Sequence, residues 1–321
     1  MRILLLEPQG YSEQARRILE ALGHVQTGPL GRQELLATVG EYDVLVIRLA
    51  HRIDSEVIAR ANRMKAIVTT TTGLDHIDLE AARKRRIAVL SLQGEREFLD
   101  TVTATAEHTW GLLLALVRRI PAAHASAVAG QWERDRFRGR ELKGRTLGVV
   151  GYGRLGRMIA RYGLAFGMQV LAYDRSDLNT EAGVTWAPLE HLLETADCVT
   201  LHLPLNETTR CMFGRAEFAR MRRGAWFLNT SRGGLIDDEA LLAALETGRL
   251  GGAALDVLDG EPDLTGATTR SLLDYAGRHD NLIITPHIGG ATTESMESTE
   301  IFMAQKLKHW VSEQQGAKSA I

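Results

Sequence analysis

A glycine-rich turn between a β-rich run and a helical pattern places the strongest constraint on the fold of this chain. The stretch Thr146–Val150 leads directly into Gly151-Tyr-Gly153-Arg-Leu-Gly156, and a helical pattern then continues to Phe166. A strand, a tight turn with this glycine spacing and a helix together form the opening of a βαβ unit. We therefore expect a doubly wound α/β domain built on a parallel sheet.

Each position of the turn has a physical role. Gly151 permits the tight turn, Gly153 lets backbone amides approach a pyrophosphate, and Gly156 allows the helix to pack closely on the strand. Arg154 and Leu155 are expected to contribute backbone N–H groups at the helix N-terminus, where anions bind. The turn predicts a dinucleotide site, and a glycine turn with a purely structural role is the alternative.

An acidic residue follows at the spacing that dinucleotide sites use. The next expected strand, Gln169–Tyr173, ends in Asp174. A carboxylate there can accept hydrogen bonds from both ribose hydroxyls of adenosine and would repel a 2′-phosphate. This favours NAD over NADP as the cofactor. Arg175 could partly neutralise the repulsion, so the strictness of that preference stays open.

The length of 321 residues predicts two domains rather than one core. Short β-rich runs alternate with helical patterns on both sides of Thr101–Ile120, an apolar stretch expected to be a helix stopped by Pro121. A last helix is expected from about Thr293 to Trp310, followed by frayed residues. The expected strands are Ile3–Leu6, Val44–Leu49, Ala66–Thr70, Ala88–Leu92, Thr146–Val150, Gln169–Tyr173, Cys198–Leu203, Trp226–Asn229, Gly252–Leu255 and Leu282–Thr285.

Three further segments follow expected strands and carry residues suited to acid–base chemistry. They contain Arg232 in Asn229–Gly234, Glu261 in the stretch from Leu255, and His287 in the stretch from Ile284. The carboxyl ends of parallel strands face the ligand crevice of a doubly wound sheet, so these side chains should meet there. Taken singly, each has an ordinary alternative: a surface arginine, a turn glutamate and a histidine next to a helix cap.

These segments, together with Gly151–Gly156 and Leu201-His-Leu-Pro204, resemble the D-2-hydroxyacid dehydrogenase family over essentially the full length. The family includes 3-phosphoglycerate, glycerate/glyoxylate and D-lactate dehydrogenases. The resemblance implies a flavodoxin-like substrate domain from residues 1–100 and 287–321, and a Rossmann NAD-binding domain from residues 101–286. It also implies an active site in the cleft between them and reversible hydride transfer between NAD(H) and C2 of a small 2-keto or 2-hydroxy acid.

The resemblance assigns the catalytic roles to Arg232, Glu261 and His287. His287 would be the general acid in reduction and the general base in oxidation. Glu261 would hydrogen-bond the other imidazole nitrogen and hold the protonated ring. Arg232 would bind the substrate carboxylate and polarise the C2 carbonyl.

The resemblance also implies further contacts with cofactor and substrate. Asp256 would accept from the nicotinamide carboxamide, although an ordinary loop aspartate is the alternative. On the substrate side, Thr72 and Gly73 would present backbone N–H groups to the carboxylate, and Arg48 would face the substrate. The remaining positions expected at the cofactor are His202, Pro204, Thr230 and Gly290.

One departure from the family pattern bears on the substrate. Phosphoglycerate-type enzymes commonly carry a second arginine two residues after Arg48, where this chain has Ala50, and Arg52 is a possible replacement. A phosphorylated substrate is therefore in doubt. No metal is expected, because hydride transfer needs none and Asp78 suits the N-cap of the helix Leu79–Lys84.

The net charge, the lengths of the apolar runs and the number of cysteines exclude several classes of partner and location. With 38 Lys and Arg against 40 Asp and Glu, the net charge of −2 gives no global basic field for nucleic acid or anionic lipid. No apolar run approaches the length of a membrane span, and two cysteines are too few for a disulfide framework. We expect a cytoplasmic enzyme, and a homodimer formed through the apolar Thr101–Ile120 helix.

Two rival functions remain open on the same scaffold. One is a non-catalytic, NAD-sensing corepressor or binding protein. The other is an enzyme that oxidises phosphite or formate, taking its hydride from phosphorus or from a formyl carbon.

Overall fold

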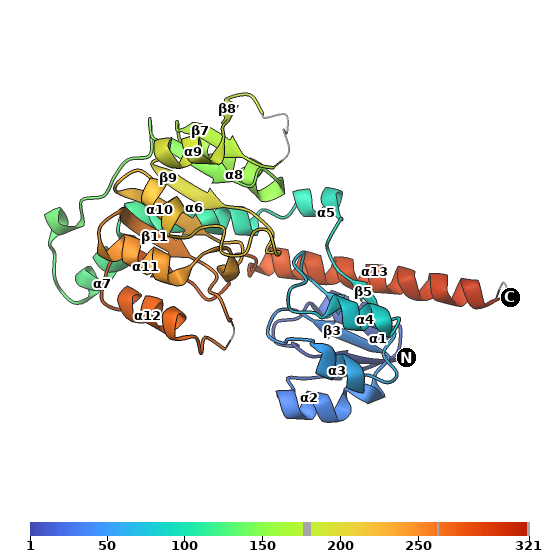
Figure 1. The fold of residues 1–321 in the computed structure, drawn as a ribbon. Coiled ribbons are helices and arrows are strands. Elements are labelled where there is room, and N and C mark those ends of the chain that lie inside the picture. The colour runs from blue at the N-terminus through green and yellow to red at the C-terminus, as the bar shows by residue number, and fades with distance from the viewer. Residues whose placement is uncertain (176–180, 262, 320–321) are drawn as a thin grey trace. The chain divides into compact units, whose positions relative to one another are not determined.

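The computed structural model describes residues 1–175, 181–261 and 263–319, and it divides into two compact units (Figure 1). Unit 1 comprises Met1–Val102 and Thr292–Ile321, and unit 2 comprises Thr103–Ala291. Each unit contains its own wholly parallel sheet covered by helices. The expected class of two doubly wound α/β domains is confirmed, and the substrate role given to the first domain stays a prediction.

Unit 1 contains a five-stranded sheet with the order β2-β1-β3-β4-β5, which is the flavodoxin-like order. One face is covered by α1, α5 and α13 and the other by α2, α3 and α4, as the two core clusters show. The strands are β1 (Arg2–Leu5), β2 (His24–Thr27), β3 (Val44–Ile47), β4 (Ala66–Thr69) and β5 (Ala88–Leu90). The helices are α1 (Glu13–Glu20), α2 (Arg32–Thr38), η1 (Val39–Glu41), α3 (Ser55–Arg60), α4 (Leu79–Lys84), α5 (Arg96–Asp100) and α13 (Thr293–Ser319).

Unit 2 contains a seven-stranded sheet with the order β12-β11-β10-β9-β6-β7-β8. The chain runs outward from β6 on one side through β7 and returns to β9 on its other side, as in a Rossmann fold. The strands are β6 (Thr146–Val150), β7 (Gln169–Tyr173), β8 (Val184–Trp186), β9 (Cys198–Leu201), β10 (Ala225–Asn229), β11 (Leu250–Leu255) and β12 (Leu282–Ile284).

The helices of unit 2 form a layer on each face of this sheet. α6 and α8 pack on one face, and α9, α10, α11 and α12 pack on the other. The helices are α6 (Ala104–Val117), α7 (Ile120–Val128), η2 (Arg134–Phe137), α8 (Arg154–Ala165), α9 (Leu189–Thr195), α10 (Arg215–Arg220), η3 (Gly233–Leu235), α11 (Asp238–Glu246) and α12 (Ala267–Ala276).

Every strand expected from the sequence is present, and the structure adds β2 and β8. Both lie at a sheet edge and are short and partly exposed. β2 alternates between exposed and half-buried positions, so only Val25 and Thr27 face inward. An edge strand needs no continuous apolar run, and the periodicity therefore missed them.

The expected effect of Pro121 was wrong in one respect. The apolar helix ends at Val117, before the proline, and Arg119 turns the chain with a φ of 53°. Pro121 then lies in the first turn of a separate helix, α7, where its missing N–H costs no hydrogen bond. The proline thus starts a helix rather than stopping one.

The last helix is longer than expected. α13 continues to Ser319, nine residues beyond Trp310, and residues 320–321 lie outside the described part of the chain. Val311 is buried in the core that α13 shares with α1, which gives the helix a reason to continue. In the same unit, Asp78 caps α4 as expected by accepting from the Ala81 N–H at 2.9 Å.

Among the described residues no single helix is long and apolar enough to cross a membrane, and one bent pair, Arg96–Val117 with Ile120–Val128, meets the criterion by length and composition only.

Candidate functional site

Strand register in unit 2 brings the predicted site residues to one edge of the sheet. Val150 pairs with Leu201, Leu201 with Asn229, Asn229 with Leu255, and Leu255 with Ile284. The residues that follow these strands therefore emerge side by side at the carboxyl edge, where doubly wound sheets bind ligands. They are Gly151, His202, Thr230, Asp256 and Thr285.

The glycine turn has the geometry that its sequence predicts. Gly151 has a φ of 95°, and a Cβ there would lie 2.4 Å from the carbonyl oxygen of His202. A Cβ on Gly156 would lie 2.0 Å from the Gly151 carbonyl oxygen. Gly153, by contrast, is the N-cap of α8 and has open space where a Cβ would be. The turn thus leaves the N-terminus of α8 accessible.

Arg154 and Leu155 form the start of α8. The half-buried Leu155 side chain packs on the hydrophobic core beneath the turn. The Arg154 guanidinium lies along the helix, 4.0 Å from the sulfur of Met158. Both observations agree with the expectation that backbone N–H groups are what this turn offers.

Asp174 connects the end of β7 to the glycine turn. Its carboxylate accepts from the backbone N–H of Tyr152 at 2.8 Å and from that of Arg175 at 2.7 Å. The Arg175 guanidinium donates to the Thr208 carbonyl at 3.2 Å, so this cation is directed toward the chain. An acid remains at the place where ribose hydroxyls are bound, which fits NAD.

His202 and Pro204 lie on the loop after β9, against the glycine turn. The His202 Nε2 is 3.0 Å from the Thr200 hydroxyl, and its Nδ1 is buried without a hydrogen-bond partner among the described residues. Burial lowers the pKa of His202 to about 3, so the ring is neutral near pH 7. Pro204 is exposed, and its carbonyl accepts from Thr209 at 2.7 Å.

Glu261 and His287 form a close pair. The Nδ1 of His287 lies 2.5 Å from Glu261 Oε1, and the two side chains are 24% and 28% exposed. Because a carboxylate only accepts, Nδ1 carries a proton and Nε2 is the nitrogen available for chemistry. The structure therefore brings together two of the three residues predicted to be catalytic in the geometry that acid–base chemistry requires.

Arg232 reaches the same region through a backbone contact. A Cβ on Gly233 would lie 2.1 Å from the Leu258 carbonyl carbon and 2.2 Å from the Asp259 nitrogen. The loop that carries Arg232 thus touches the loop that leads to Glu261, and only a glycine allows it. The side-chain amide of Asn229 donates a hydrogen bond to the backbone carbonyl of Arg232 at 2.8 Å.

Asp256 has a different environment from the one expected. It is 1% exposed, and it accepts from the Thr285 hydroxyl at 2.6 Å and from the backbone N–H groups of Ile288 and Gly289 at 2.9 and 2.7 Å. Burial raises the pKa of this carboxyl, but hydrogen bonds from His108, Thr285 and the two backbone groups outweigh it and hold that pKa below its ordinary value. A contact with nicotinamide stays a prediction.

Two other predicted cofactor contacts differ in accessibility. Thr230 is 6% exposed and its hydroxyl lies 2.7 Å from that of Thr109 on α6. Gly290 is exposed, with open space around its Cα. Gly290 is thus available to a ligand, whereas Thr230 is already engaged inside unit 2.

In unit 1, Arg48 is held by groups of its own unit. Its guanidinium donates to the backbone carbonyls of Glu7 and Gln9 at 2.5 and 2.8 Å and pairs with Glu300 at 3.4 Å. Its side chain is only 17% exposed. Arg48 thus ties β3 to α13 and to the loop after β1, and its predicted role toward substrate competes with these bonds.

Thr72 and Gly73 lie on the loop after β4. Thr72 is exposed, and the Gly73 carbonyl accepts from the Thr71 hydroxyl at 2.8 Å. The loop is ordered by its own hydrogen bonds, as an anion-binding loop must be. The substrate contact assigned to it stays a prediction.

Sequence reasoning missed His108 on α6. Its Nε2 lies 3.2 Å from Asp256 Oδ1 and 3.0 Å from the Thr285 hydroxyl. The signal in the sequence is one histidine in a largely apolar helical stretch, between Glu107 and Thr109, and nothing local indicates that it reaches residues far along the chain.

Known proteins resemble this chain over most of its length. Residues 110–289 match the family model described as D-isomer specific 2-hydroxyacid dehydrogenase, NAD binding domain. A hydroxypyruvate reductase from Thermotoga maritima is 37% identical over 87% of this chain and 88% of its own length. The chain belongs to the D-isomer specific 2-hydroxyacid dehydrogenase family.

Other members of the 2-hydroxyacid dehydrogenase family show the range of relatives. A D-3-phosphoglycerate dehydrogenase from Methanocaldococcus jannaschii is 38% identical over 96% of this chain. The matched region covers 57% of the length of that dehydrogenase, which is therefore a longer protein. The structure of a D-lactate dehydrogenase from Aquifex aeolicus complexed with NAD and lactic acid has a TM-score of 0.87 and 28% identity, covering 98% of this chain and 97% of that one.

The residues of unit 2 fit the NAD that this family domain binds. The N-terminus of α8 is open at Gly153, the backbone of the turn approaches closely at Gly151, and Asp174 stands at the end of β7. These are the three features that a pyrophosphate and an adenosine ribose require.

Proposed function

We propose that this chain is an NAD-dependent D-2-hydroxyacid dehydrogenase that interconverts a small 2-keto acid and the corresponding 2-hydroxy acid. The pairing of His287 Nδ1 with Glu261 Oε1 at 2.5 Å carries the proposal. It supplies a histidine with a defined tautomer beside an NAD-type sheet edge. NAD supplies the hydride acceptor or donor when it is bound.

The chemistry of the pair follows from charge. When hydride reaches C2 of a ketone, negative charge develops on the oxygen and a proton must arrive there. His287 Nε2 is the ring nitrogen that gives this proton, and Glu261 stabilises the doubly protonated ring from the other side. In the oxidative direction the neutral Nε2 accepts the hydroxyl proton.

Arg232 is proposed to bind the substrate carboxylate. Its guanidinium is a permanent cation whose planar fork matches a carboxylate, and Gly233 keeps its loop against the loop of Glu261. A cation next to the C2 oxygen also stabilises the developing charge.

We further propose that the preferred substrate is not phosphorylated. Glyoxylate, hydroxypyruvate and similar acids need one cation for their carboxylate, whereas a phosphate needs another. Arg48 is already paired with Glu300 and bound to two backbone carbonyls, which supports the smaller, singly charged acids.

The direct test is a panel of keto acids with NADH, followed by the absorbance of NADH. The panel contains glyoxylate, hydroxypyruvate, 3-phosphohydroxypyruvate, pyruvate and longer 2-keto acids, with His287→Ala as the control. We expect turnover of an unphosphorylated acid and its loss in the control. NADH binding without turnover of any acid would favour an NAD-sensing protein, and turnover of phosphite or formate would favour the other rival.

We also propose a cytoplasmic homodimer. The free cysteines Cys198 and Cys211 agree with a reducing compartment. The expected contact through the apolar helix is not supported, because α6 buries its apolar side chains inside unit 2. The most exposed large apolar side chains among the described residues lie on and next to α7 instead: Ile120 and Val128 are 52% and 74% exposed, and Trp132 is 89% exposed.

A further inference from the structure

His108 links the helix α6 to the loop that carries His287. Its Nε2 lies 3.2 Å from Asp256 Oδ1 and 3.0 Å from the Thr285 hydroxyl oxygen, and its side chain is 20% exposed. Neither partner is near His108 in the sequence, since they lie 148 and 177 residues further along. The contact is therefore a product of the fold of unit 2.

The hydrogen-bond partners define the protonation of the ring. The Thr285 hydroxyl gives its proton to Asp256 Oδ1 at 2.6 Å, so its oxygen can only accept from His108. The Asp256 carboxylate also only accepts. Nε2 of His108 must therefore carry a hydrogen, which it shares between the two oxygens.

Asp256 in turn holds the backbone around His287. Its carboxylate accepts from the N–H groups of Ile288 and Gly289, and its carbonyl accepts from the N–H of His287 at 2.8 Å. His287 has a φ of 53°, a left-handed conformation that costs free energy for a residue with a Cβ. Such a conformation persists only where the surroundings impose it, and here the hydrogen bonds to Asp256 do so.

We propose that His108 is a positioning residue for His287: through Asp256 and Thr285 it holds the loop 287–289 in the conformation that points the imidazole toward its reaction. This rests on the proposed function. In this role His108 acts through Asp256 and Thr285 rather than on the substrate.

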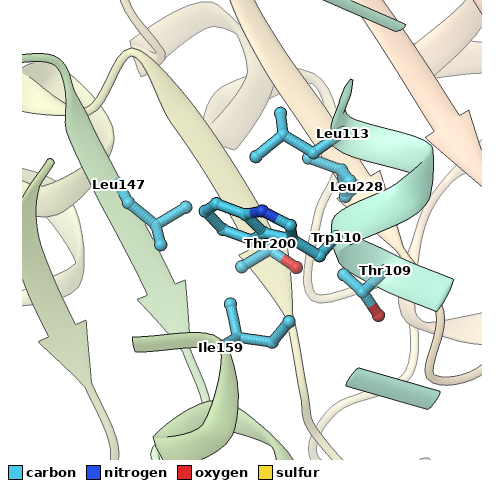
Figure 2. A pocket seen from close by; sticks show the side chains of 7 residues that line it. All are labelled: Thr109, Trp110, Leu113, Leu147, Ile159, Thr200 and Leu228. Carbon is cyan, nitrogen blue, oxygen red and sulfur yellow. The ribbon is translucent and has the colours of Figure 1, made fainter. Parts of the chain in front are cut away.

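The packing of α6 makes His108 a rigid support. Thr109, Trp110 and Leu113 face the sheet from α6 (Figure 2), and the Trp110 ring packs edge-on to Tyr162 and Phe166. The helix therefore cannot shift without breaking this core. The seven side chains around the small pocket in Figure 2 are Thr109, Trp110, Leu113, Leu147, Ile159, Thr200 and Leu228.

Close packing at Gly289 supports the same conclusion from the side of the loop. A Cβ on Gly289 would lie 2.9 Å from Asp256 Oδ2 and 3.7 Å from Cδ2 of His108. The loop thus lies directly against the carboxylate and the imidazole, and the absence of a side chain at this position is what lets it do so.

The test compares two amides at position 108. In His108→Gln the side-chain NH₂ takes the place of Nε2–H, whereas in His108→Asn it is too short to reach Asp256 and Thr285. Both side chains are polar amides, but Asn is the poorer helix former, so the free energy of unfolding of each variant is measured as well. A difference between folded variants then reports reach. His279→Leu is the control, because His279 lies in unit 2 and its ring contacts Tyr275, four residues earlier, by a hydrogen bond to the carbonyl and by stacking on the ring.

The first readout needs neither substrate nor cofactor: the ¹⁵N chemical shifts of the His287 ring, assigned by comparison with His287→Gln. The second is the division between kcat and KM on the acid that wild type turns over. We expect His108→Asn to move the His287 signals and lower kcat about tenfold with little change in KM. His108→Gln and His279→Leu should resemble wild type in both.

Separate measurements test the role of His108 and the proposed function. If wild type turns over no acid, the proposed function fails, and the His287 chemical shifts still decide the role of His108. Equal His287 shifts in the folded Asn and Gln variants and wild type, or equal kcat values in all three, would overturn the positioning role.

Discussion

At the scale of single residues, the charge on Glu261 determines how well His287 can hold a second proton. Glu261→Gln keeps an oxygen that can accept from Nδ1 but removes the negative charge. We expect kcat for keto-acid reduction to fall about ten- to a hundredfold, with a smaller change in KM, because a charge-assisted hydrogen bond becomes a neutral one. Steady-state kinetics at several pH values would measure this, and an unchanged kcat throughout would contradict the role of Glu261.

Asp238 illustrates a residue whose ionisation opposes folding. Its side chain is buried, and its Oδ1 lacks a partner among the described residues while Oδ2 accepts from Thr269 at 3.2 Å. Burial, with the nearby charges of Asp259 and Asp237, raises the pKa of Asp238 from 3.8 to about 6. The folded state therefore binds the proton more tightly than the unfolded state does.

The sign of the pH effect follows from this shift. The contribution of Asp238 to the free energy of unfolding should be highest below pH 4, should fall as the pH rises to about 6, and should then stay level. Asp238→Asn removes that fall, so above pH 6 the variant should be more stable than wild type by about 1 to 3 kcal/mol. Urea unfolding at pH 4 and pH 7 measures it. Glu239→Gln, an exposed acid in the same helical turn, controls for the helix dipole and should show no such pH-dependent gain.

At the scale of elements, glycine has two different roles in the turn between β6 and α8: Gly156 allows close packing, and Gly153 leaves space for a ligand. Gly156→Ala would place a Cβ 2.0 Å from a backbone oxygen, whereas Gly153→Ala meets nothing within 4 Å. We expect Gly156→Ala to lower the free energy of unfolding by about 2 kcal/mol or more. Gly153→Ala should fold normally and weaken NADH binding, because its methyl group faces the pyrophosphate site.

Thermal unfolding and NADH fluorescence titration on both variants would test this contrast. Equal stability of the two proteins would contradict the close packing of helix on strand. Unchanged NADH affinity in Gly153→Ala would instead contradict the placement of the pyrophosphate at the N-terminus of α8.

Elements also show where periodicity is a poor guide. The core helices α6 and α8 were expected from their apolar patterns, and both are present. The break at Arg119 was not expected, because a left-handed residue between two helices has no apolar signature. The extension of α13 was missed for a related reason: the burial of Val311 depends on α1, which is far away in the sequence.

At the scale of the whole molecule, the most exposed large apolar side chains among the described residues are Trp132, Val128 and Ile120, on and next to α7. Trp132→Glu should convert the proposed homodimer to a monomer, because burying a carboxylate in an apolar interface without a partner is costly. Light scattering after size exclusion measures the mass. A dimer that persists in Trp132→Glu would contradict the placement of the interface at α7. A monomeric wild type would contradict the dimer itself.

Local sequence order was enough to predict the two doubly wound domains, the glycine turn and the catalytic candidates. Each of these depends on local order: a strand, a turn and a helix in succession, or a polar residue directly after a strand. Gly151, Gly156 and Asp174 could be identified in this way because steric limits and residue spacing act over a few neighbours.

Which of these residues meet depends on the packing of the folded chain. The contact between Glu261 and His287, the engagement of Arg48 by Glu300, and the reach of His108 to Asp256 join residues 26, 252 and 148 positions apart. Such contacts depend on strand register and on the packing of helices against the sheet, which arise from the whole chain. Local sequence sets which side chains are available, and the fold sets which of them share a hydrogen bond.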